Sequence, residues 1–339
     1  MTMRRKSDRR IRPCALAVVI AAVAVVMNAQ PIFALDQVTI TEPNHVIGYL
    51  PLYVAQRRGF FAEQGIEATW TTIETGSGPT NAILTGQAFA MLGGPEHNAY
   101  ATIKGADLRA IAGVLMRSSV YVMAAKGQEP VSRPGSAAEW ASYFKGRTIG
   151  TGAYGSTPNS VTRFLLTQFG LRANADVQLI EMPSTAIVAA MKAGRIQVGV
   201  VNEPLVTQGI RDSIWGEPIY AVPLELGPYA WATVNVRADT IAHQPELLER
   251  FVRALAKGLN ATYSDPAASV GVAKQEFPTI ALEDLTAAVK RCLADQLWSK
   301  DGFIEPAAWT MAQNVVRSAG LLKQEVPYEE VIDMRFVKR

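Results

Sequence analysis

Apolar and polar residues follow strand and helix periods in turn along most of the chain after residue 35. Val38 and Ile40 alternate with polar neighbours, which predicts a strand over 37–41. Short apolar runs bounded by Gly, Pro or polar residues predict further strands. These runs cover 67–73, 88–92, 108–115, 119–126, 147–151, 176–182 and 196–201, and residues 218–239 predict one or two more.

Helical periodicity fills the intervals between these strands, and this alternation indicates an α/β fold. Pro51 opens a helix that we expect Gly65 to close. Other helices are expected over 138–146, 160–170 and 184–194. From Gln244 onward the chain is mainly helical. One helix there has apolar residues at i, i+3 and i+4 spacing, namely Leu247, Phe251, Ala254, Leu255 and Leu259.

The pattern repeats once within the chain. Residues 48–51 and 155–158 both place a glycine three positions before a proline that opens a helix. Residues 86–96 and 194–204 match at nearly the same spacing, and each runs from a glycine through a strand to a loop with Pro and Glu. Two matches in the same order predict two lobes of similar α/β construction.

The repeat sets the expected domain boundaries. We expect a first lobe over 35–124 and 225–339 and a second lobe over 125–224, each built on a mixed sheet. The chain would cross between them near 120–128 and 216–235, which makes a hinge of two segments. The C-terminal helices would pack on the first lobe.

The N-terminal segment has the composition of an export signal. Residues 1–13 are basic, residues 14–27 are wholly apolar, and Ala34 is a candidate cleavage point. An uncleaved anchor is the alternative, and Sec and twin-arginine export both remain open. Because this segment holds six of the Lys and Arg residues and one acid, the remainder of the chain is slightly acidic. We therefore expect the periplasm as its location, and no nucleic-acid partner.

The sequence offers no catalytic or metal-binding constellation. Cys14 lies in the predicted signal, and Cys292 falls on the apolar stripe of a helix, where a buried core thiol is expected. The three histidines have no metal-ligand spacing, so we expect no metal and no cofactor.

Candidate binding groups gather where strands end and helices begin. In open α/β sheets this edge is the usual ligand site, and free N–H groups at helix starts favour polar ligands. Ser156 and Thr157 could donate to a ligand or merely cap their helix. Tyr49, Tyr154 and Tyr229 could form aromatic walls or pack in the core.

Glu96 and Glu203 come from matching loops of the two repeats. Their carboxylates could grip an N–H or hydroxyl donor, or could be solvated loop acids. Glycoside chemistry needs two carboxyls at a fixed separation, which two mobile lobes would not provide. No Lys or Arg stands in these loops, so a tightly held sulfonate or phosphate lacks its usual partner.

Several segments resemble one known family. "PLYVAQRRGFFAEQGIEATW", "ILTGQAFAMLGG", "GRTIGTGAYGSTPNSVTRFLL" and "MKAGRIQVGVVNEP" are similar to successive parts of the SsuA/THI5-like periplasmic binding proteins for nitrate, sulfonate, taurine and thiamine-pyrimidine ligands. The resemblance implies a type II periplasmic binding protein fold that closes around one ligand. With the strand-end argument, it gives the candidate ligand-binding residues Tyr49, Leu50, Gly94, Pro95, Glu96, Tyr154, Ser156, Thr157, Glu203 and Pro204.

The expected function is therefore that of a monomeric periplasmic solute-binding protein. Its partners would be a small organic ligand and the permease and ATPase of an ABC importer at the inner membrane. The two glutamates favour a ligand with N–H or OH donors over an inorganic anion. The alternatives are an enzyme of the pyrimidine-synthase-like branch, which would need a Cys-rich motif, and a ligand-sensing module.

Overall fold

The computed structural model describes residues 1–2, 34–74 and 77–338 of the chain. The predicted signal peptide therefore lies almost wholly outside the described residues. The residues from Asp36 onward form one compact unit. No helix in the described part is both long and apolar enough to cross a membrane.

The first sheet has the strand order β2-β1-β3-β9-β4 in the described part of the chain. Strands β1, β2 and β3 are parallel, and β9 runs antiparallel between β3 and β4. Its strands are β1 (Asp36–Glu42), β2 (Ile66–Thr72), β3 (Ala90–Gly93), β4 (Leu108–Leu115) and β9 (Ala232–Arg237).

The second sheet has the order β5-β8-β6-β7, and it repeats the construction of the first. Read as β7-β6-β8-β5, three parallel strands are followed by an antiparallel one, as in β2-β1-β3-β9. Its strands are β5 (Val120–Ala124), β6 (Thr148–Thr151), β7 (Gln178–Glu181) and β8 (Val198–Asn202). The predicted α/β fold of two mixed sheets is confirmed.

The antiparallel strands β5 and β9 lie next to the two segments in which the chain crosses between the sheets. Strand β9 returns to the first sheet after the second is complete, and β5 enters the second sheet directly after β4. Strand β5 pairs with β8 although we expected residues up to 124 to belong to the first lobe. The precise lobe boundaries stay a prediction.

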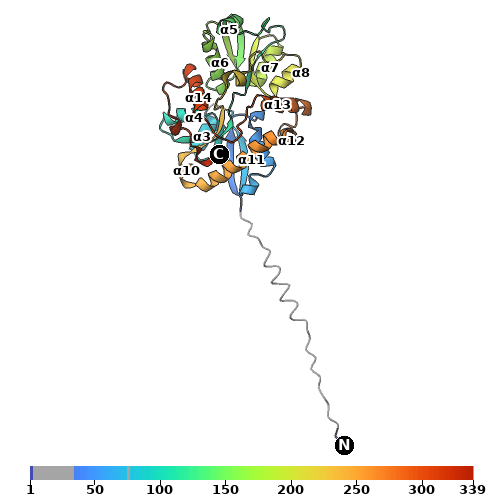
Figure 1. Ribbon diagram of the computed structural model, residues 1–339, viewed down its shortest axis with the longest axis vertical. Helices are drawn as coiled ribbons and strands as arrows, with labels where there is room; N and C mark the ends of the chain where they lie inside the picture. The colour runs from blue at the N-terminus through green and yellow to red at the C-terminus, as the bar shows by residue number, and fades with distance from the viewer. Residues whose placement is uncertain (3–33, 75–76, 339) are drawn as a thin grey trace. The chain divides into compact units, whose positions relative to one another are not determined.

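Helices cover both sheets, and Figure 1 shows α5 to α8 around the second sheet and α3, α4 and α10 to α12 around the first. Those before β9 are α2 (Leu50–Arg57), α3 (Gly78–Leu84), α4 (Glu96–Thr102), α5 (Ala137–Phe144), α6 (Thr157–Gln168), α7 (Ser184–Lys192), α8 (Leu205–Arg211) and α9 (Val222–Leu226). Those after it are α10 (Ala238–His243), α11 (Pro245–Ser264), α12 (Pro266–Glu276), α13 (Leu282–Ala294) and α14 (Pro306–Ser318). Short 3₁₀ turns are η1 (Ile47–Tyr49), η2 (Ala62–Gln64), η3 (Tyr328–Glu330) and η4 (Met334–Phe336).

One local expectation was wrong. Helix α2 ends at Arg57 rather than near Gly65, because Gly59 takes a left-handed φ of 75° and the chain turns so that Phe61 is buried. Within 218–239, where one or two strands were expected, one strand forms, β9, and α9 precedes it because Pro223 in its first turn favours a helix start.

Of the C-terminal helices, which were expected on the first lobe, α10 to α12 pack there, whereas α13 and α14 do so only in part. Helix α11 buries Phe251, Ala254 and Leu255 and lies against α2. Gly258 allows this close approach, because a Cβ there would overlap the Pro51 carbonyl oxygen. Helices α13 and α14 also reach the second lobe, where α13 contacts α8 and α14 contacts α6. In Figure 1 both lie at the level where the two halves meet.

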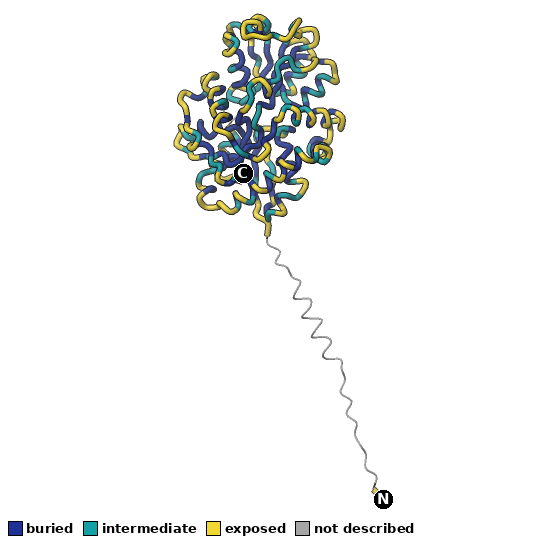
Figure 2. Tube along the Cα trace, viewed as in Figure 1, coloured by how far each residue is buried: buried dark blue, intermediate teal, exposed yellow. Residues whose placement is uncertain are grey.

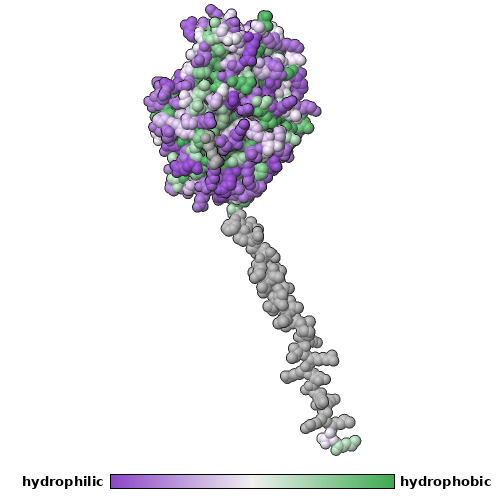
Figure 3. Space-filling view, in the orientation of Figure 1, coloured by the Kyte–Doolittle hydropathy of each residue, from purple (hydrophilic) through white to green (hydrophobic). Residues whose placement is uncertain are grey.

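Apolar side chains lie mainly in the core. The buried stretches in Figure 2 follow the strands and the inner faces of the helices. Figure 3 shows a visible face on which hydrophilic side chains predominate and hydrophobic ones form scattered groups. The predicted core thiol is confirmed, since Cys292 is buried in α13 and burial raises its pKa.

Candidate functional site

Glu96 begins α4 at the carboxyl end of β3, and its side chain is 1 % exposed. The carboxyl folds back over the preceding loop, and a Cβ on Gly94 would overlap it. A glycine is therefore needed at position 94 for this carboxyl position. Pro95 is the residue that caps α4, without a side-chain hydrogen bond to the helix.

Thr157 of the second lobe reaches the same carboxyl. Its hydroxyl donates a 2.8 Å hydrogen bond to Glu96 Oε1. Thr157 opens α6, and Ser156 caps this helix by accepting from the Asn159 N–H. The predicted role of Ser156 as a helix cap is thus observed, whereas the Thr157 hydroxyl joins the two lobes.

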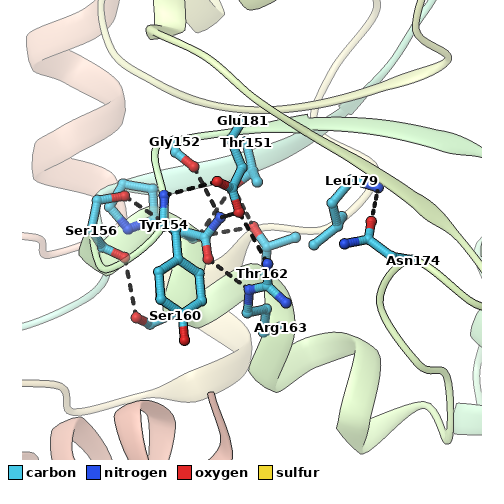
Figure 4. Close-up of polar contacts among 12 residues, drawn as sticks. Thr151, Gly152, Tyr154, Ser156, Ser160, Thr162, Arg163, Asn174, Leu179 and Glu181 are labelled. Atoms are coloured by element: carbon cyan, nitrogen blue, oxygen red, sulfur yellow. Dashed lines mark hydrogen bonds and ion pairs between the residues drawn. The ribbon is translucent and has the colours of Figure 1, made fainter. Parts of the chain in front are cut away.

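A polar network holds the loop that carries Thr157 (Figure 4). Asn159 Nδ2 donates to the Gly152 carbonyl at 3.0 Å and to Glu181 Oε1 at 3.1 Å, and Arg163 donates to the same Glu181 oxygen. Tyr154 lies at the outside of this loop. It is 57 % exposed, and its ring faces the Arg163 guanidinium at 5.1 Å.

Three buried polar atoms near Glu96 have no hydrogen-bond partner among the described residues. They are Glu96 Oε2, Tyr100 Oη and Tyr229 Oη. Tyr100 is one turn further along α4, and Tyr229, which is wholly buried, lies shortly before β9. We call Glu96, Tyr100 and Tyr229 the Glu96 cluster. Buried polar groups are nearly always paired, so unpaired ones call for an explanation.

Electrostatic effects indicate that these groups lie close together. Burial raises the pKa of Tyr100 and of Tyr229, and the Glu96 carboxyl adds to both effects. Burial and the charges of Glu42 and Glu96 raise the pKa of Tyr49. Burial also raises the pKa of Glu96, against smaller opposing effects of His97 and of the Thr157 hydrogen bond. These shifts favour a neutral Glu96 carboxyl.

Tyr49 and Leu50, the predicted binding residues at the first helix start, both lie in the main hydrophobic core. Leu50 is wholly buried, and Tyr49 is 5 % exposed. Tyr229 was expected either in an aromatic wall or in the core, and it is wholly buried, with its ring at a centroid distance of 5.5 Å from that of Trp231. Tyr100 was missed, because one tyrosine in a helix has no distinguishing sequence signal.

Glu203 lies in the matching loop of the second lobe but has different partners. Its carboxylate accepts from the Thr207 N–H and hydroxyl and from Arg291 Nε at 3.0 Å. Arg291 belongs to α13 and also pairs with Glu217. Burial raises the pKa of Glu203, while Thr207 and Arg291 act in the opposite direction. Pro204 follows in a cis peptide and is buried.

A third buried carboxylate ends β1. Glu42 is 1 % exposed and accepts from Tyr53 at 2.5 Å, from Thr72 at 3.1 Å and from His45 Nδ1 at 2.8 Å. His45 Nε2 lies 3.6 Å from Glu276 of α12. The hydrogen bond with Glu42 raises the pKa of His45. The sequence showed His45 only as one of three histidines without metal-ligand spacing.

The described residues contain no group of three or more His, Cys, Asp or Glu side chains arranged to hold a metal ion. The Glu96 cluster presents one carboxyl oxygen and two hydroxyls in a buried setting, and Thr157 ties it to the second lobe.

Comparisons with known proteins agree with this architecture. The sequence model of a family described as NMT1/THI5 like matches residues 44–269. The chain is 22% identical over 309 residues to the putative binding protein YtlA of Bacillus subtilis, with 90% of each chain covered. It is 27% identical over 343 residues to the riboflavin-binding protein RibY of Chloroflexus aurantiacus, covering 91% of this chain and 88% of the relative.

The fold is also similar to that of a solved binding protein. The alkanesulfonate-binding protein SsuA from Xanthomonas axonopodis pv. citri, solved with MOPS bound, aligns with a TM-score of 0.67 at 16% identity. The alignment covers 88% of this chain and 98% of that one. At this identity the likeness establishes the periplasmic binding protein fold alone.

Proposed function

Because the chain belongs to the NMT1/THI5-like family, we propose that it is the solute-binding component of an ABC importer and captures a small organic ligand between its two lobes. The observation that carries the proposal is the Glu96 cluster. It holds unpaired polar atoms at the edge of the first sheet, and Thr157 of the second lobe bonds to the same carboxyl. A ligand there would be held from both sides.

Closure of the two lobes would be the working step. A ligand that contacts both Glu96 and the α6 start favours the closed arrangement, because it binds that arrangement more tightly than the open one. The hinge segments before β5 and before β9 would absorb the motion. A permease would then recognise the closed form.

The predicted N-terminal signal supports a periplasmic location, with a permease and its ATPase at the inner membrane as partners. We propose that the exported form begins near Leu35 and works as a monomer. Mass spectrometry of the secreted protein tests the first point. An intact Met1 form would contradict export with cleavage.

Binding without chemistry is the function we propose. YtlA and RibY are both named as binding proteins, and the thiol of Cys292 is buried in α13 with a raised pKa. A buried neutral thiol is a poor nucleophile.

A thermal-shift panel tests the proposal directly. The panel contains riboflavin and alkanesulfonates including MOPS, because the relatives are named for such ligands, and it contains nitrate because the resemblance of the sequence includes nitrate-binding proteins. A compound present at a hundred times its dissociation constant stabilises a protein by about 2.7 kcal/mol, which is readily measured. If no compound in a panel extended to amino acids, pyrimidines and aromatic acids raised the melting temperature, the proposed function would be contradicted.

A matched pair of variants tests the site. Thr157→Val removes the hydroxyl that bonds to Glu96, whereas Thr167→Val removes an exposed hydroxyl that bonds within α6. We expect Thr157→Val to lower affinity for the best compound by about tenfold, in line with the loss of one hydrogen bond. Thr167→Val should leave affinity unchanged. Equal affinities in the two variants would show that the Thr157 hydroxyl does not contribute to ligand binding.

A further inference from the structure

The Glu96 cluster restricts the charge of what can bind. Glu96 is 1 % exposed and Tyr229 is wholly buried, so a group placed against them would be cut off from water. Each unpaired atom then needs a partner on the ligand, since an unmatched buried polar group is costly. A site of this kind rejects ligands that lack the matching group far more strongly than an apolar pocket does.

Among the described residues, no Lys or Arg pairs with the cluster, and the titratable group that acts on Glu96 is His97, whose charge opposes the effect of burial on the Glu96 pKa. Neither Lys nor Arg donates to Glu96 or forms an ion pair with it there, and its side-chain donor is the Thr157 hydroxyl. Glu203 contrasts with it, because Arg291 lies 3.0 Å from that carboxylate. Proteins that bind carboxylates, sulfonates or phosphates normally supply an Arg or Lys partner. The Glu96 cluster offers an anion only hydroxyls and a carboxyl group.

We propose that the ligand of this site meets the Glu96 cluster with an uncharged amide-like edge, in which a C=O and an N–H stand side by side as in a carboxamide, lactam or ureide. This inference rests on the proposed function, because it names the ligand class of the same site. Tyr100 and Tyr229 hydroxyls can each donate or accept, so they fit either group of such an edge. Glu96 Oε2 supplies the third contact.

The protonation state of Glu96 supports an uncharged partner. Burial raises its pKa and favours the neutral carboxyl. With Oε1 accepting from Thr157, a neutral carboxyl donates from Oε2 to a ligand acceptor. A cationic ligand would instead require the ionised form, buried beside two neutral hydroxyls.

A set of three compounds that share one ring tests the inference. Benzamide, benzoate and benzamidine have the same shape and carry an uncharged, a negative and a positive group. Dissociation constants are measured with the exported form of the full protein by ligand-observed NMR. We expect benzamide to bind at least about tenfold more tightly than either charged compound, because the site offers benzoate no Lys or Arg partner among the described residues and offers benzamidine a carboxyl that burial favours in its neutral form.

The outcomes separate the inference from the proposed function. Tighter binding of benzoate or benzamidine would overturn the inference while leaving a solute-binding role intact. Absence of binding by all three would also overturn it, even if a compound of the wider panel binds. Failure of the whole panel and of this set would contradict both.

Two variants show whether the cluster is responsible. Glu96→Gln keeps an uncharged group that can donate and accept. We therefore expect the binding of benzamide to weaken by about three- to tenfold, and the order of affinities of the three compounds to stay the same. A loss of a hundredfold or more, or a reversal of the order, would mean that an ionised carboxylate is needed and would overturn the inference.

Tyr229→Phe removes a hydroxyl that has no partner in the part of the chain that the structure describes, and it should weaken the binding of benzamide by about tenfold. Tyr121→Phe is its control, because that buried hydroxyl donates to Asp295 at 2.6 Å, outside the cluster. We expect Tyr121→Phe to leave benzamide binding unchanged. Equal effects of the two variants would contradict a role for Tyr229.

Discussion

Glu96 and Glu203 occupy equivalent loops of the two repeats, and both are buried, yet their surroundings differ. Glu203 accepts from Thr207 and from Arg291, whereas Glu96 accepts from Thr157 and has one oxygen without a partner among the described residues. One carboxylate therefore connects the second lobe to α13, and the other is the one that we propose binds the ligand. The comparison teaches that a structural repeat conserves the position of a side chain without conserving its role.

The largest expected effect is on stability. Glu203→Ala leaves the Arg291 guanidinium with Glu217 as its remaining partner in a largely buried position, so we expect the free energy of unfolding to fall by about 3 kcal/mol. Glu96→Ala should change it by less than about 1 kcal/mol, because within the described residues the Glu96 carboxyl accepts one hydrogen bond from another side chain, that of Thr157. Urea denaturation of both variants measures the difference. Equal losses would show that the two carboxylates play the same structural part.

Two buried tyrosines, Tyr121 and Tyr229, allow the same comparison between a bonded and an unpaired group, with a smaller expected effect on stability. Tyr121→Phe breaks a hydrogen bond to the Asp295 carboxylate, which should lower the free energy of unfolding by about 1.5 kcal/mol. Tyr229→Phe breaks none and should leave it unchanged or slightly higher. Denaturant unfolding of the two variants at one pH is the measurement. A destabilised Tyr229→Phe variant would mean that its hydroxyl has a partner after all.

Substitutions at two neighbouring glycines distinguish an effect on the Glu96 carboxyl from an effect on the nearby backbone. Gly94→Ala places a methyl group where the Glu96 carboxyl lies, so the carboxyl must move and ligand affinity should fall by about tenfold. Gly93→Ala is its control, because a Cβ there would lie 3.4 Å from the His97 ring and fits without large shifts. Calorimetric titration with the best compound compares them. Unchanged affinity in Gly94→Ala would contradict the assigned carboxyl position.

The smallest effect concerns pH and the third carboxylate, Glu42. The hydrogen bond with Glu42 raises the folded-state pKa of His45 above its ordinary value of 6.5. The stabilisation by protonated His45 is therefore complete below pH 6.5 and is lost as the pH rises through the folded-state pKa. Because the His45 side chain is one-third exposed, at 34%, we expect only a modest slope.

Melting temperatures across the range from pH 5.5 to about pH 8.5 measure this slope. The native protein should lose stability across that range, and His45→Gln should lose less. Identical profiles would mean that Glu42, like Glu203, is stabilised by its other donors and that His45 adds nothing.

Much of the fold could be predicted from local patterns. Alternating residues in the segment that forms β1, the apolar run that forms β4 and the repeat at 48–51 and 155–158 indicated two sheets of like construction, and β2-β1-β3-β9 and β7-β6-β8-β5 have that construction. Local signals failed where a left-handed glycine intervened, as at Gly59.

The candidate site was only partly predictable. Gly94, Glu96 and Thr157 could be found because they end strands or begin helices, and the structure brings the latter two into contact. The difference between Glu96 and Glu203 could not be found, because it depends on Arg291, which lies in a distant helix. The exposed position of Tyr154 and the core position of Leu50 likewise follow from tertiary packing.

The most direct test of the central claim is a calorimetric titration of the best compound into Glu96→Leu and Glu203→Gln. Glu96→Leu removes the cluster's carboxyl, and we expect affinity to fall by about a hundredfold or more. Glu203→Gln keeps the shape of a side chain bonded within the protein, so affinity should stay within about threefold. A loss confined to Glu203→Gln, or no loss in Glu96→Leu, would contradict the assignment of the ligand to Glu96.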